Sequence, residues 1–168
     1  TVTETGTIAG VTNDPAAATG KTVTVTVADN GDGTLTATAD FTADNPLTFT
    51  NTYNVGTIEA DFPVKKVLSV PAGLTGPAEW SYTIDVAANG DAPAAAQMTS
   101  TVTKAADTVT FGPFTYAAPG TYTYTVTETG TIAGVTNDED ASGKTVTVTV
   151  TDNGDGTLTA TADFTADN

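Results

Sequence analysis

The sequence contains no cysteine and no histidine among its 168 residues. Without thiols and imidazoles the chain forms no disulfide, and thiol catalysis, serine–histidine catalysis and zinc binding through such side chains are excluded. No cluster of convergent carboxylates stands in for them. We therefore expect a protein that is not an enzyme and that needs no metal or other cofactor. A secreted β-protein of this composition must gain its stability from a covalent crosslink other than a disulfide.

Positive charge is scarce as well. Five lysines and no arginine stand against twenty acidic residues, which gives a net charge of -15. Such a surface repels phosphate backbones and anionic lipid, so we expect no nucleic acid partner and no membrane insertion. A membrane-length apolar run and a signal peptide are both missing. We therefore expect a mature or excised segment.

Threonine and valine, in contrast, are abundant. Both are β-branched and favour strands, and their alternating runs are separated by turns rich in Asn, Asp and Gly, such as those at 29–33 and 152–156. Short strands with regular turns predict an all-β fold, an Ig-like or jelly-roll-like β-sandwich. The expected strands are 2–4, 22–28, 34–41, 47–53, 58–70, 79–86, 98–103, 108–114, 121–128, 145–151 and 157–164.

The chain also repeats itself. Residues 1–14 recur unchanged as 125–138, and 22–45 recur as 145–168 with one difference, in which Thr151 replaces Ala28. This pattern predicts a tandem repeat whose boundary lies inside the chain. We expect residues 1–54 to be the C-terminal part of one repeat, including its closing strand. Residues 55–168 are then the next repeat, without a closing strand.

Three of the expected strands carry a polar residue on their apolar face. Period-two counting places Lys66, Glu128 and Asn51 among apolar neighbours, which is costly unless the three side chains meet. Burial favours a neutral amine and a protonated carboxyl, so the amine could attack the carboxamide while the acid polarises its carbonyl. Ammonia would leave in a site closed to water, and an amide crosslink would remain. In the alternative interpretation, the lysine extends to solvent and the other two side chains lie at strand ends.

Several motifs support the crosslink. Residues 119–128 read PGTYTYTVTE, and they are followed by GVTND at 134–138 and TVTVTVTDNGDGTLT at 145–159. Together with VKK at 64–66 and FTN at 49–51, these motifs resemble the pilin isopeptide-linkage domain of Gram-positive surface proteins. The resemblance covers residues 58–168 and, as a partial copy, residues 1–53.

The resemblance implies a role for each polar residue. Lys66 would be the amine, with Lys65 as the second choice, and Asn51 would be the acceptor. Glu128 and its copy Glu4 would promote the reaction. The resemblance further implies a pilus shaft or adhesin stalk outside the cell, on the bacterial surface, whose partners are other copies of itself or neighbouring repeats.

Lys66 and Asn51 belong to different repeats, so each is expected to bond within its own unit rather than to the other. Either the chain is cut from a longer array, or residues 46–53 complete the open sheet of another molecule by strand donation. A competing function is an adhesin repeat that binds a host glycan or protein through its loops. Trp80 and Tyr82 could offer a sugar-stacking platform, although alternation favours core packing for both.

Overall fold

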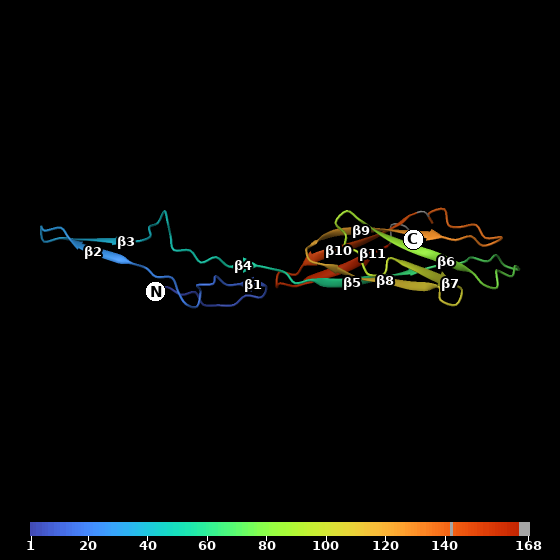
Figure 1. Ribbon diagram of the computed structural model, residues 1–168, viewed down its shortest axis with the longest axis horizontal. Helices are drawn as coiled ribbons and strands as arrows, with labels where there is room; N and C mark the ends of the chain where they lie inside the picture. Colours follow the sequence, from blue (N-terminus) through green and yellow to red (C-terminus); the bar gives the residue numbers. More distant parts are fainter. Residues whose placement is uncertain (142, 165–168) are drawn as a thin grey trace. The chain divides into compact units, whose positions relative to one another are not determined.

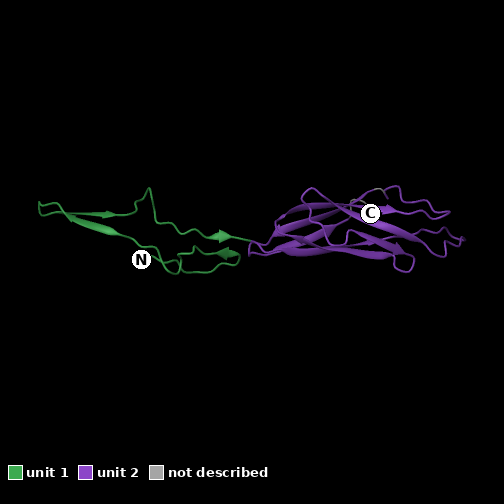
Figure 2. Ribbon diagram, viewed as in Figure 1, with its two compact units in different colours: residues 1–54 green, residues 55–168 purple. Residues whose placement is uncertain are grey.

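The computed structural model describes residues 1–141 and 143–164 (Figure 1). These residues form strands and turns but no helix, which confirms the predicted all-β class. No helix long and apolar enough to cross a membrane occurs in the described part of the chain. The chain divides into two compact units, residues 1–54 and residues 55–168 (Figure 2).

The second unit is built from two antiparallel sheets. One has five strands in the order β11-β10-β9-β6-β7, and the other pairs β5 with β8, with a bulge between Ala60 and Phe62. Side chains from both sheets form a single core, so the unit is a β-sandwich. The strands are β5 (Ile58–Lys65), β6 (Ser81–Asn89), β7 (Thr99–Thr103), β8 (Thr108–Tyr116), β9 (Gly120–Thr129), β10 (Lys144–Asp152) and β11 (Leu158–Asp163).

Aromatic rings fill the middle of this core. Phe62 of β5 stacks on Phe114 of β8 with their ring centroids 5.2 Å apart, and Phe114 lies 4.6 Å from Tyr124 of β9. Trp80 and Tyr82 are also buried, with 8% and 1% of their surface exposed. These two rings therefore pack in the core and offer no exposed stacking surface.

The first unit uses the same strand sequences without a comparable core. Its strands are the hairpin β2 (Val25–Asp29) and β3 (Leu35–Ala39) and the short pair β1 (Val11–Thr12) and β4 (Thr52–Tyr53). Among its described apolar residues, Ala17 alone is buried. The expected strand 47–53 thus forms ladder pairs only at its last two residues, and the expected strand 2–4 is reduced to a bridge between Val2 and Lys21.

The repeat shows what a second layer does for these sequences. Three apolar residues of the first unit are 55–69% exposed, whereas their counterparts in the second unit, which lie against the β5–β8 sheet, are 1–5% exposed. The sequence is the same, but the second unit adds neighbouring strands to the hairpin and a second sheet that covers it. The exposed residues are Val25, Val27 and Leu35, and their buried counterparts are Val148, Val150 and Leu158.

This pairing gives an internally controlled prediction. Val148→Ala should lower the free energy of unfolding of the second unit by about 2 kcal/mol, because it removes two buried methyl groups and leaves a cavity. Val25→Ala, the same substitution at the equivalent exposed position, should change the free energy of unfolding of the first unit by no more than about 0.5 kcal/mol. Urea unfolding of both variants measures the difference. Equal effects would contradict the assignment of the core.

Candidate functional site

Lys66 and Glu128 meet at one end of the sandwich. Lys66 follows the last residue of β5, where its backbone N–H donates to the Asp107 carbonyl over 2.8 Å. Its Nζ lies 2.7 Å from Oε1 of Glu128, a residue of β9, and 4.4 Å from the centre of the Tyr82 ring. The two charged side chains are only 9% and 12% exposed. An amine and a carboxylate are thus in direct contact and almost removed from solvent.

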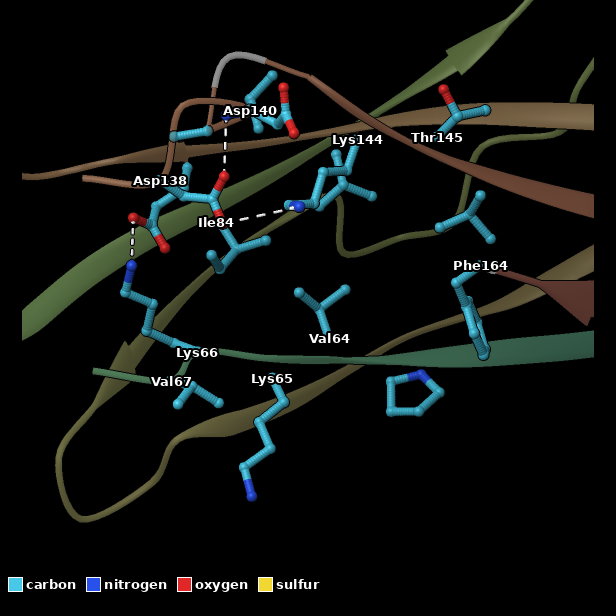
Figure 3. Close-up of a pocket in the computed structure, with 16 residues that line it drawn as sticks. Val64, Lys65, Lys66, Val67, Ile84, Asp138, Asp140, Lys144, Thr145 and Phe164 are labelled. Atoms are coloured by element: carbon cyan, nitrogen blue, oxygen red, sulfur yellow. Dashed lines mark hydrogen bonds and ion pairs between the residues drawn. The ribbon is translucent and has the colours of Figure 1, made fainter. Parts of the chain in front are cut away.

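Lys65 has different surroundings. Its side chain is 61% exposed, and its Nζ lies 3.5 Å from Oδ2 of Asp107. Figure 3 shows Lys65 and Lys66 extending in different directions from the chain. Alternation continues past the end of β5, with Phe62 and Lys66 buried and Lys65 exposed. The structure therefore places Lys66, rather than Lys65, beside Glu128.

In the first unit, the equivalent glutamate, Glu4, binds a different side chain. Asn51 Nδ2 donates to Oε1 of Glu4 over 2.6 Å, and the backbone N–H of Asp14 donates to Asn51 Oδ1 over 2.8 Å. The other oxygen of Glu4, Oε2, is buried and has no hydrogen-bond partner among the described residues. The residue Asn51 itself is exposed, contrary to the expected core position, because the unit has no second layer to cover it.

The backbone around the two glutamates is arranged in the same way. Glu4 N–H donates to the Ala17 carbonyl over 2.9 Å, and Glu128 N–H donates to the Ala141 carbonyl over 2.7 Å. In both copies an asparagine side chain also donates to the carbonyl of the glycine seven residues before it, over 2.8 Å. Each unit thus builds the same frame, with a lysine on the carboxylate in one unit and an asparagine in the other.

Sequence reasoning missed two residues of this frame, Asp14 and Lys21. Asp14 Oδ2 accepts hydrogen bonds from the backbone N–H of Thr50 and from Lys21 Nζ, each over 2.9 Å. Lys21 Nζ also donates to the carbonyl of Thr48 over 2.6 Å. The Thr50 N–H and the Lys21 amine lower the pKa of Asp14 to about 2.

The repeat held a signal for this pair. The loop between residues 15 and 20 differs in length and sequence from its counterpart, yet an aspartate and a lysine flank it in both copies. The counterparts are Asp138 and Lys144, whose charged atoms lie 3.7 Å apart.

A cavity of about 490 Å³ lies beside Lys66 and Glu128 in the second unit. Its walls combine apolar side chains with the charged ends of these residues and of Asp138 and Lys144, and Figure 3 shows Lys66, Asp138 and Lys144 around it. Residues 135–136 are the counterparts of β1, which pairs with β4 in the first unit, but they belong to no strand. The apolar walls include Val64, Ile84, Val126, Val146 and Phe164.

A family model described as FctA, Spy0128-like isopeptide containing domain, matches residues 1–54 and again residues 62–168. Neither the curated proteins nor the solved structures gave a match. The two matched stretches together take in nearly the whole chain and correspond to its two units. The chain therefore belongs to the family of Spy0128-like isopeptide-containing domains, the pilin domain that its motifs resemble.

Proposed function

We propose that this chain is a structural module of a pilus shaft or surface stalk, and that an amide between Lys66 and a closing-strand asparagine staples its repeat. Membership of the isopeptide-containing pilin family supports the shaft role and a location on the cell surface or in a pilus. One observation carries the chemistry. Equivalent glutamates hold a lysine amine in one unit and an asparagine carboxamide in the other.

A complete repeat would bring both partners to one carboxylate. Glu128 holds Lys66 through Oε1, while Glu4 holds Asn51 through Oε1 and keeps a second buried oxygen that has no partner among residues 1–141 and 143–164. A carboxylate has two oxygens and can accept from both groups at once. The amine would then lie next to the carboxamide carbon, and the reaction would proceed within one pre-assembled site.

The same carboxylate can move every proton that the reaction requires. Glu128 takes a proton from the Lys66 ammonium, and the neutral amine attacks the asparagine carbon while the C=O electron pair moves to Oδ1. The carboxylic acid then protonates Nδ2, the electron pair on Oδ1 re-forms the C=O bond, the C–Nδ2 bond breaks and ammonia leaves. The new amide nitrogen returns one proton to the carboxylate. The products are an amide, one ammonia and a protonated glutamate.

The asparagine that reaches Lys66 must come from a strand that closes the second unit. A strand with the sequence of residues 46–53 fits the requirement, because residues 135–136 are identical to the β1 residues that pair with it in the first unit. In an array, the remaining part of the same repeat would supply this strand. Another molecule of the chain would supply it by strand donation.

The test is the intact mass of a completed repeat. Adding the sequence of residues 46–54, PLTFTNTYN, after Asn168 gives the second unit a closing strand of its own. Under denaturing conditions the product should lack the mass of one ammonia, and Glu128→Ala should retain it. Glu4→Ala alters the equivalent residue of the first unit and should leave the loss unchanged. An extended chain of full mass would rule the crosslink out.

A further inference from the structure

We propose that Asp138 prepares the closing strand for reaction in two ways. Its carboxylate and Lys144 clamp the strand, and its backbone N–H binds the asparagine oxygen on which negative charge develops. This inference rests on the proposed function and adds two groups to the Lys–Glu–Asn set. The geometry that carries it is seen on the identical residues of the first unit.

The orientation of the Asn51 carboxamide is fixed by its contacts. The backbone N–H of Asp14 can only donate, so the atom that it meets at 2.8 Å is the carbonyl oxygen. The nitrogen of the carboxamide then faces Glu4 at 2.6 Å. The glutamate is therefore placed to protonate the leaving nitrogen, not to polarise the carbonyl as the sequence suggested. The N–H of Asp14 occupies the place of an oxyanion donor.

The carboxylate of Asp14 holds the part of the strand that directly precedes that contact. It accepts the N–H of Thr50, the residue directly before Asn51, and it binds Lys21, which in turn reaches the Thr48 carbonyl. The ring of Phe49 lies 4.8 Å below the Lys21 amine. Three consecutive residues of the closing strand are thus held by one ion pair, and the reacting carboxamide comes next.

The second unit contains the same clamp in an open form. The carboxylate of Asp138 accepts the N–H of Asp140 over 2.9 Å, as Asp14 accepts that of Ala16 over 2.8 Å, so the turn is preserved. Its side chain is 49% exposed, against 11% for Asp14, and its distance to the lysine is 3.7 Å instead of 2.9 Å. The clamp faces the cavity that holds Lys66, in position to close on an entering strand (Figure 3).

The reaction of the Asn51→Ala chain with the synthetic peptide PLTFTNTYN tests both parts. In this chain Lys66 and Glu128 are intact, and the carboxamide of its own closing strand, that of Asn51, is absent. Adduct formation, followed by denaturing mass spectrometry over a range of peptide concentrations, yields a half-saturating concentration and a limiting rate. Asp138→Asn should raise the half-saturating peptide concentration roughly tenfold and leave the limiting rate unchanged, because it weakens only the clamp.

The backbone donor needs a different change. Replacing Asp138 by the corresponding α-hydroxy acid exchanges its N–H for an ester oxygen and keeps the carboxylate. The limiting rate should fall about 100-fold while the half-saturating concentration stays the same. A merely structural role would not separate the two parameters in this way.

Each remaining result has one meaning. Wild-type kinetics in the Asp138→Asn chain would overturn the clamp, and wild-type kinetics in the ester would overturn the oxyanion donor. If the completed repeat loses its ammonia but the peptide forms no adduct, the open clamp does not capture a strand and this inference fails alone. A completed repeat of full mass would remove the proposed function itself.

Discussion

Mixing Lys66→Ala chains with Asn51→Ala chains should produce a covalent dimer that neither variant forms alone. The first variant retains a closing strand with its carboxamide but has no amine in the cavity beside Glu128. The second retains Lys66 and Glu128 but donates a strand that cannot react. One bond per pair is therefore possible, and the dimer should lack one ammonia relative to the sum of the two masses. A denaturing gel and an intact mass of the mixture measure it.

The wild-type chain gives a second form of this prediction, because each molecule carries both the cavity with Lys66 and a closing strand that it can donate. Concentrated wild-type protein should form a ladder of covalent multimers, with one ammonia lost for every bond. Adding Glu128→Ala to the Asn51→Ala partner should abolish the dimer of the mixture. A wild-type monomer that has lost ammonia would show a bond within one chain and would contradict strand donation.

The completed repeat should be far more stable than the same chain whose added strand carries alanine in place of its asparagine. That control keeps the Lys66–Glu128 pair and removes the bond together with the hydrogen bonds of the carboxamide. A crosslink that closes a loop of about 100 residues stabilises a fold by about 4.7 kcal/mol in the chain-entropy estimate. For a unit of this size the melting temperature should differ by roughly 15–20 °C. Calorimetry of the two chains, with mass spectra to verify the bond, gives the comparison.

The outcome that contradicts this prediction is a difference of only a few degrees in the presence of a verified bond. The entropy that the bond removes from the unfolded chain would then be small, as happens when an unfolded state retains structure of its own. The assignment of the bond would stand, and its role as a stabilising staple would not.

Much of the fold could be predicted because its signals are local. Alternating Thr and Val with Gly-rich turns indicated strands, and the structure confirms the all-β sandwich. The same alternation placed Lys66 and Glu128 on apolar faces, and the structure brings them into contact. The expected burial of Asn51 was wrong. Period-two counting shows which face a residue takes, but not whether another layer covers that face.

The Asp–Lys clamp could not be predicted in the same way. Asp14 and Lys21 lie outside the strands, and their contacts with residues 48–50 join segments far apart in the sequence. No periodicity encodes such contacts. The only trace was that both residues flank a variable loop in each copy, and alignment of the copies shows this without saying what they bind.

The identity between residues 1–14 and 125–138 has a consequence for how an array would assemble. Two acceptor surfaces with one sequence offer an incoming strand equal affinity, so reversible association cannot tell a correct neighbour from a wrong one. An amide that does not reopen would then preserve whichever pairing forms first. Fidelity would rest on timing, with each repeat closing as it emerges and before its twin is available to compete.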